Sequence, residues 1–101
     1  MKIRLFLVDD HQVVRTGLRM LLDNEADVEI VGEAGTAREA MAAVDKIKPD
    51  VILMDIGLPD MSGIEATQKI KSAHPTMAVV ALTIHEDEEY FFRMLDAGAS
   101  G

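Results

Sequence analysis

The chain has 101 residues, of which 49% are hydrophobic and 28% are charged, and its formal net charge is −8. These values predict one soluble globular domain, because no apolar run approaches the about 20 residues that span a membrane. The acidic balance excludes a typical nucleic-acid-binding surface, which collects Lys and Arg against phosphate. Without cysteine there are no disulfides or thiolate chemistry, and without a signal peptide the expected location is the cytoplasm.

Strand-like and helix-like segments alternate along the first half of the chain. Residues 3–8 form an apolar run that predicts a strand, and residues 12–22 follow at helical spacing. One face of that predicted helix carries Val14, Leu18, Leu21 and Leu22. Residues 28–31 predict a second strand, after which Thr36 can cap a helix with Glu39 at the capping-box position. The expected inward residues of this helix are Ala40, Met41, Val44 and Ile47.

The same alternation continues in the second half. Residues 51–54 predict a buried strand, and Ser62 can cap a helix that carries Ile64, Thr67, Ile70 and Lys71 at steps of three and four. Residues 77–82 predict a fourth strand, and residues 86–97 a last helix that ends at Gly98. Strands that alternate with helices through short connections indicate an α/β fold. We expect a parallel sheet with right-handed crossovers and helices on both faces.

Acidic residues follow two of these strands directly. Asp9 and Asp10 come after the first strand and Asp55 after the third, while Thr83 ends the fourth. In open α/β sheets, ligands bind outside the carboxyl ends of the strands. If the first and third strands are neighbours, the three carboxylates converge in one shallow cleft, where their like charges favour a cation. A hard, oxygen-seeking ion such as Mg²⁺ suits such a cleft.

Each of these residues also has an ordinary structural explanation. Asp is common where strands end, and the nearby Gly57 and Pro59 are turn formers. Adjacent acids such as Asp9 and Asp10 can form a solvated strand end, because neighbouring side chains point to opposite faces of a strand. The expected meeting of all the acids and Thr83 at one edge favours a functional site over these separate coincidences.

Three motifs resemble those of receiver domains in bacterial two-component response regulators, the CheY-like fold. They are "LVDDH" at residues 7–11, "ILMDIGLPDMSG" at residues 52–63 and "ALT" at residues 81–83. The stretch "VDDHQVVRTGL", with "DAGASG" later, is most similar to the subfamily whose full-length members carry a LuxR-type helix-turn-helix domain. The resemblance covers nearly the whole chain. It implies a flavodoxin-like, doubly wound parallel sheet with strand order 2-1-3-4.

The resemblance also implies roles for the acids. Asp55 would be the phosphoacceptor, taking a phosphoryl group from the phosphohistidine of a sensor histidine kinase. Asp10, Asp55 and the backbone carbonyl of Gly57 would bind Mg²⁺ or Mn²⁺, and Asp9 would help through a water molecule. Because Gly57 has no side chain, it leaves the phosphoryl site open and is expected to affect the dephosphorylation rate. Such a domain is no enzyme beyond its own phosphotransfer and autodephosphorylation.

Further residues match the family around this site. Thr83 resembles the switch residue, whose hydroxyl bonds a phosphoryl oxygen, although a β-branched residue at a strand end is common for structural reasons alone. Pro59 and Gly63 match positions that shape the loop after the phosphoacceptor. His85 can cover the site from two residues beyond Thr83. His11 is interpreted as a surface or capping group and not as a metal ligand.

One departure from the family pattern concerns the end of the chain. Receivers have a fifth strand, a fifth helix and a lysine that contacts the phosphoryl group, whereas this sequence stops at Gly101. Residues 1–101 are therefore expected to be a C-terminally truncated receiver, with the DNA-binding output domain outside the chain. We expect an unpaired edge at residues 77–82, self-association or a homodimer, retained Mg²⁺ binding, and impaired phosphorylation and switching.

Two alternatives differ in kind. One is a truncated receiver-fold module for interaction or dimerisation that is regulated without phosphorylation. The other is a phosphatase of the haloacid dehalogenase type, which also uses an Asp nucleophile and Mg²⁺. That family places a second acid two residues after the nucleophile, where this chain has Gly57 after Asp55. The match to the phosphatase family is therefore poor.

Overall fold

The computed structural model describes residues 2–82, 98 and 100. Its elements are β1 (Ile3–Val8), α1 (Gln12–Leu22), β2 (Val28–Ala34), α2 (Ala37–Ile47), β3 (Val51–Asp55), α3 (Gly63–Ala73) and β4 (Ala78–Leu82). The helix predicted at residues 86–97, together with Thr83 and His85, lies outside the described residues. Within the part that is described, no helix is both long and apolar enough to cross a membrane.

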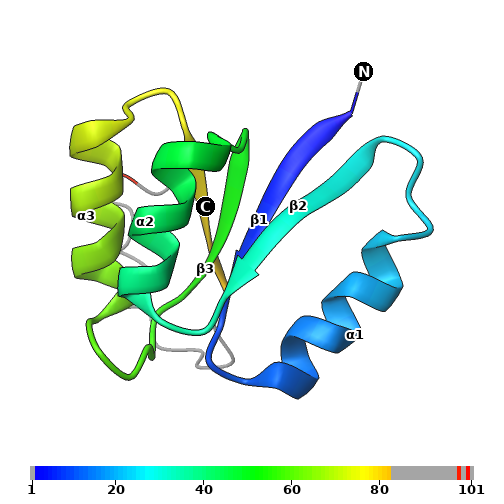
Figure 1. Cartoon of the computed structure of the whole chain (residues 1–101), viewed down its shortest axis with the longest axis horizontal. Helices are drawn as coiled ribbons and strands as arrows, with labels where there is room; N and C mark the ends of the chain where they lie inside the picture. Colours follow the sequence, from blue (N-terminus) through cyan, green and yellow to red (C-terminus); the bar gives the residue numbers. More distant parts are fainter. Residues whose placement is uncertain (1, 83–97, 99, 101) are drawn as a thin grey trace.

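The four strands form one parallel sheet in the order β2-β1-β3-β4. This is the flavodoxin-like order expected from the sequence, with β1 and β3 as neighbours. Figure 1 shows α2 and α3 together on one face of the sheet and α1 on the other. The prediction of helices on both faces is therefore confirmed.

Most predicted element boundaries agree with the structure to within a residue. The Thr36 hydroxyl accepts a hydrogen bond from the Glu39 backbone N–H at 3.1 Å, and the Ser62 hydroxyl accepts one from the Ile64 N–H at 3.1 Å. Both predicted N-caps are confirmed. The exception is β2, which reaches Ala34 and not residue 31. Its register against β1 shifts at Val31, so the strand continues beyond an irregularity that the apolar pattern did not indicate.

The main core lies between the sheet and the pair α2 and α3. Alternate strand residues point into it, because successive side chains of a strand face opposite ways. From the strands these are Phe6, Val8, Ile52, Met54 and Val79, and from the helices Ala40, Val44, Ile64, Ala66 and Ile70, all of them buried. Met41 and Ile47 are partly buried against this cluster. The predicted inward face of α2 is therefore confirmed.

Helix α1 covers the other face less completely, and none of its residues is buried. Leu18 and Leu22 are half-buried, but Val14 and Leu21, which the helical spacing placed on the same face, are exposed. The polar side of α1 explains the difference. Arg15 and Arg19 form ion pairs with Glu33 of β2, which turns their face of the helix toward the sheet.

Two further contacts join distant parts of the described fold, one between β1 and the end of α2 and one between Ser100 and β4. The Arg4 guanidinium donates to the carbonyl oxygens of Ile47 and Lys48 at 2.8 Å each, and so satisfies the end of α2. Ser100 donates its backbone N–H to the Val79 carbonyl at 2.6 Å. The sequence predicted an unpaired edge at residues 77–82. Strand β4 is indeed the last strand of the described sheet, but the bond from Ser100 shows that its outer edge is not wholly unpaired.

Candidate functional site at the carboxyl edge of the sheet

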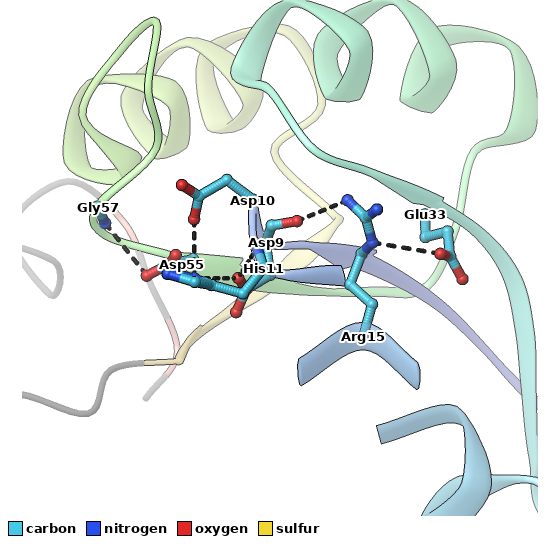
Figure 2. Close-up of polar contacts among 7 residues, drawn as sticks. All are labelled: Asp9, Asp10, His11, Arg15, Glu33, Asp55 and Gly57. Carbon is cyan, nitrogen blue, oxygen red and sulfur yellow. Dashed lines mark hydrogen bonds and ion pairs between the residues drawn. The ribbon is translucent and has the colours of Figure 1, made fainter. Parts of the chain in front are cut away.

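The carboxylates of three aspartates meet where β1 and β3 end. Val8 of β1 pairs with Met54 of β3, so the residues that follow, Asp9 and Asp55, lie side by side. Asp9, Asp10, His11 and Asp55 each offer one potential ligand atom, and these four atoms lie within 4.8 Å of one another. The convergence expected from the strand order is therefore present in the structure (Figure 2).

Asp9 is the buried member of the cluster, with 4% of its surface exposed. Its backbone N–H donates to the Ala34 carbonyl at 3.1 Å, which ties the end of β1 to the end of β2. Its carboxylate Oδ1 accepts the His11 backbone N–H at 2.8 Å. The next residue, Asp10, is exposed. The pair thus presents one fixed carboxylate and one that faces solvent.

Asp55 is the last residue of β3, and its side chain enters the site from the neighbouring strand. Burial raises the pKa of Asp55, the Gly57 N–H opposes this rise, and the charges of Asp9 and Asp10 add to it. The Gly57 bond to Asp55 Oδ1 measures 3.1 Å. A carboxylate that is disfavoured by burial and by like charges is one that a cation would stabilise.

His11 takes part in the cluster more than the sequence suggested. It is the N-cap residue of α1, but its side chain makes no capping bond. Its Nδ1 lies 3.0 Å from Asp9 Oδ1 and 3.0 Å from Asp10 Oδ1. The hydrogen bond to Asp9, followed by the charge of Asp10, raises the pKa of the His11 ring. The imidazole therefore supplies a local partner for two of the three acids.

The donor set suits a hard divalent cation. Three carboxylates supply oxygen atoms, the ligands that Mg²⁺ and Mn²⁺ prefer, and Mg²⁺ needs only one or two of them because it keeps several waters. A Cβ built on Gly57 has no neighbour within 4 Å among the described residues, so no part of residues 2–82 fills the space beside Asp55. The acidic residues that the sequence analysis proposed as metal ligands therefore have the right chemistry to bind a divalent cation.

The β3–α3 loop, residues 56–62, is fixed at both ends. The Gly63 N–H donates to the Ile56 carbonyl at 2.8 Å, and a Cβ on Gly63 would lie 2.2 Å from the Asp55 carbonyl oxygen. Only glycine allows this close approach, which agrees with the shaping role expected of Gly63. Pro59 lies exposed within the same loop. The loop that follows Asp55 therefore has a defined path.

Asp60 ties this loop to α2, a contact that the sequence did not indicate. Its two carboxylate oxygens accept the backbone N–H groups of Ala37 and Arg38 at 2.8 and 3.0 Å. The Ala37 bond is the largest cause of the lowered pKa of Asp60; burial opposes it, and the Arg38 bond lowers the pKa further. No local signal marks this role, because the partner helix begins more than 20 residues earlier in the chain.

Sequence reasoning also missed the side chains that support Asp9 from α1. The guanidinium of Arg15 donates to the Asp9 carbonyl oxygen, and Glu33 of β2 pairs with that guanidinium (Figure 2). One signal was available. Arg15 and Arg19 stand one helical turn apart on a helix that begins beside the acids, so they share a face.

This fold and this edge define a class of protein: a doubly wound α/β domain with a carboxylate cluster suited to a divalent cation. The model of the response regulator receiver domain family matches residues 5–101. The chain therefore belongs to the response regulator receiver family, as the resemblance of its motifs implied. This membership also decides against the phosphatase alternative.

Curated relatives agree with this assignment. The response regulator GacA of Pseudomonas viridiflava is 41% identical over 99 residues, which cover 98% of this chain and 46% of GacA. The response regulator protein VraR of Staphylococcus aureus strain COL is 43% identical over 98 residues, covering 97% of this chain and 47% of VraR. The chain thus spans about half the length of the curated relatives it matches.

Solved structures show the same fold. A LuxR-family two-component response regulator from Aurantimonas sp. SI85-9A1 superposes with a TM-score of 0.95 at 36% identity, covering 100% of this chain and 72% of that one. The receiver domain of the putative response regulator NarL from Mycobacterium tuberculosis gives a TM-score of 0.93 at 29% identity, covering 99% and 81%. The chain is similar to LuxR-family and NarL receivers over its whole length.

Proposed function

We propose that Asp55 is the phosphoacceptor of a two-component signalling pathway. The observation that supports this most directly is the position of its carboxylate, at the end of β3 and beside those of Asp9 and Asp10. In the proposed reaction a carboxylate oxygen of Asp55 attacks the phosphorus atom of a phosphohistidine on a sensor kinase. The phosphorus–nitrogen bond breaks, and the imidazole leaves and takes up a proton. The product is an acyl phosphate on Asp55.

Residues of this chain would prepare that attack. The Gly57 N–H holds one carboxylate oxygen of Asp55 and so orients the group. Asp10, Asp55 and the Gly57 carbonyl would hold Mg²⁺ or Mn²⁺, with Asp9 acting through a water molecule. The ion would offset the charge that gathers on the phosphoryl oxygens, which is the main requirement of phosphoryl transfer. We assign no enzymatic activity beyond self-catalysed phosphotransfer and autodephosphorylation.

The signal would then pass to residues near the site and to a separate output. Thr83 is the proposed switch residue, and His85 is proposed to cover the site. The relatives are named response regulators, and one, DegU of Brevibacillus brevis, is named a transcriptional regulatory protein. We therefore propose that this receiver controls transcription through a LuxR-type DNA-binding domain. On this proposal the chain acts in the cytoplasm and has no DNA contact of its own.

We also propose that the domain self-associates through α1. Val13, Met20 and Leu21 are all exposed on this helix, and exposed apolar groups favour contact with another protein surface. Light scattering over a wide concentration range should show the average mass rising with concentration. The change Leu21→Glu should shift the average mass toward that of a monomer. A single monomeric mass at all concentrations would contradict self-association.

The phosphoacceptor is tested with acetyl phosphate as donor. Mass spectrometry should find one added phosphoryl group in the presence of Mg²⁺, and none in EDTA or in Asp55→Asn. As a matched control, Asp23→Asn removes an exposed aspartate at the far end of α1 and should be labelled like the unaltered chain. Labelling that persists in Asp55→Asn would show that the site is wrong. A chain that binds Mg²⁺ but is never labelled would favour an interaction module regulated without phosphorylation.

A further inference from the structure

The main-chain carbonyl of Asp9 is held by a side chain from α1. Arg15 Nη1 donates to this oxygen at 2.7 Å (Figure 2). The carbonyl belongs to the peptide that joins Asp9 to Asp10, so its direction sets how both side chains leave the backbone. A hydrogen bond from a charged donor is stronger and more directional than one between neutral groups. Arg15 is therefore placed to fix the part of the chain that presents both acids.

The charge of Arg15 is balanced away from the acid cluster. Its side chain is only 17% exposed, and a charge buried to this extent requires a partner. That partner is Glu33, whose Oε1 lies 3.2 Å from Arg15 Nε. Nε makes no hydrogen bond with any described residue, so this contact is an ion pair without a directional bond. The directional bond of the guanidinium goes to the Asp9 carbonyl.

Arg19 fixes the same glutamate from one turn further along α1. Its Nε donates to Glu33 Oε2 at 2.5 Å, so the two arginines form ion pairs with different oxygens of one carboxylate. Among the described residues, the Arg19 side chain forms its hydrogen bond and ion pair with Glu33 alone, whereas the Arg15 side chain also reaches Asp9. The two residues share a helix face and a partner, and they differ in the contact to the acid loop. Arg19 therefore serves as a control for Arg15.

Gly35 leaves the space in which the Arg15 guanidinium lies. A Cβ built on Gly35 would come within 2.9 Å of Arg15 Nη1, the atom that bonds Asp9, and its next neighbours lie 4.0 Å away. A methyl group at this position would displace the guanidinium and leave every charge in place. The chain thus offers a second way to test Arg15, one that does not alter it.

We infer that Arg15 is a positioning residue for the acid cluster: paired with Glu33 and housed by Gly35, it fixes the Asp9–Asp10 peptide in the orientation that receives a divalent cation. Because it bonds the carbonyl and is neutralised by Glu33, it does not compete with a cation for the carboxylates. The effect on cation binding rests on the proposed function. The effect on the loop itself does not.

The first test is a titration with Mg²⁺ alone. The amide chemical shifts of His11 and Gly57 are measured by NMR at each Mg²⁺ concentration. Loss of a group that orients metal ligands typically weakens binding roughly 10-fold or more. We expect a decrease of that order for Arg15→Gln and for Gly35→Ala, and little change for Arg19→Gln. Arg15→Lys keeps the ion pair with Glu33 but lacks the guanidinium fork. Arg15→Lys should unfold at the same temperature as the unaltered chain. Its Mg²⁺ affinity should lie between those of Arg15→Gln and the unaltered chain.

The second test is amide hydrogen exchange in EDTA, which needs no cation. The His11 N–H is bonded to Asp9 Oδ1 and reports on the acid loop directly. Its exchange should be faster in Arg15→Gln and Gly35→Ala, by about 10-fold if one charge-assisted hydrogen bond is lost. It should be unchanged in Arg19→Gln. A residue that only fastens α1 to β2 would affect Arg15→Gln and Arg19→Gln alike.

The outcomes separate this inference from the proposed function. Equal Mg²⁺ affinity and equal His11 exchange in the unaltered chain, Arg15→Gln and Gly35→Ala would overturn the role of Arg15 and leave the proposed function intact. An unaltered chain that fails to bind Mg²⁺ would overturn the proposed function, and the exchange measurement would then decide the role of Arg15. If Arg15→Gln does not fold, Gly35→Ala supplies both measurements.

Discussion

The two faces of the sheet are covered in different ways. Between the sheet and α2 and α3 the core is fully buried, as at Phe6, which is 1% exposed. On the other face α1 buries none of its residues, and Leu21 is 71% exposed. The packed face therefore holds the fold together mainly by burial of apolar surface, whereas the α1 face depends on ion pairs as well as partial burial.

Each face supports a different acid of the site. On the packed face, the close approach of Gly63 to the Asp55 backbone fixes the carboxyl end of β3. On the α1 face, Arg15 fixes the carbonyl of Asp9. The comparison suggests that changes on the packed face alter stability first, and that changes on the α1 face alter the site with a smaller cost in stability.

The largest effect is expected for Phe6→Ala. Removing a fully buried aromatic side chain leaves a cavity and typically lowers the free energy of unfolding by about 3–5 kcal/mol. Leu21→Ala, on the exposed side of α1, should change it by no more than about 0.5 kcal/mol at a protein concentration at which the unaltered chain is monomeric. Urea unfolding followed by circular dichroism measures both. Comparable losses for the two variants would contradict the difference between the faces.

Gly63→Ala should have the next largest effect. The added Cβ would meet the backbone of Asp55 and Ile56, which cannot move aside as a flexible side chain can. Overpacking of this kind typically costs about 1–3 kcal/mol, and here it would also displace the carbonyl end of β3. Gly57→Ala is the matched control, since its Cβ meets no atom within 4 Å in the part of the chain that the structure describes. Thermal unfolding in EDTA should show a clear decrease in Tm for Gly63→Ala alone.

Asp60→Ala should lower Tm by a few degrees, because it removes the acceptor for two N–H groups at the start of α2. The contribution should also depend on pH. Since the folded pKa of Asp60 is lowered, its stabilisation is present above the ordinary aspartate pKa and is lost as pH falls through the folded value. The difference in Tm between the variant and the unaltered chain should therefore shrink below about pH 4. A difference that is constant down to the lowest pH would contradict the carboxylate cap.

The smallest effect is expected for Asp55→Asn, and its sign should depend on the cation. The raised pKa of Asp55 means that its charge opposes folding above the ordinary aspartate pKa, and that this penalty is relieved as pH falls through the folded value. In EDTA at pH 7, Asp55→Asn should therefore have a slightly higher Tm than the unaltered chain. In excess Mg²⁺ the order should reverse, because bound ligand stabilises the folded state. A variant that is less stable under both conditions would contradict this account.

Much of this structure could be predicted because the relevant signals are local. Apolar runs and helical spacing indicate the elements, and parallel strands bring Asp9, Asp10 and Asp55 to one edge whenever β1 and β3 are neighbours. The motifs around these acids indicated the family. The capping residues Thr36 and Ser62 were also evident, since each bonds a residue within three positions of itself.

The contacts that were missed join residues far apart in the sequence. Asp60 reaches Ala37, and Arg15 pairs with Glu33, but nothing in the spacing of either residue identifies its partner. The same limit explains why the sequence did not indicate which side of α1 faces the sheet. Helical periodicity indicated a stripe of apolar residues that included Leu21, which is exposed in the structure. The rotation of the helix against the sheet also depends on the ion pairs that Arg15 and Arg19 form with Glu33.

The open space beside Gly57 has a practical consequence. The chain contains no cysteine, so Gly57→Cys would introduce a single thiol, and its Cβ would meet none of the described residues within 4 Å. A fluorophore attached there would lie within two residues of Asp55 without any change to the buried core. A fluorophore at position 57 could therefore report in real time on the binding and release of a cation at this edge of the sheet.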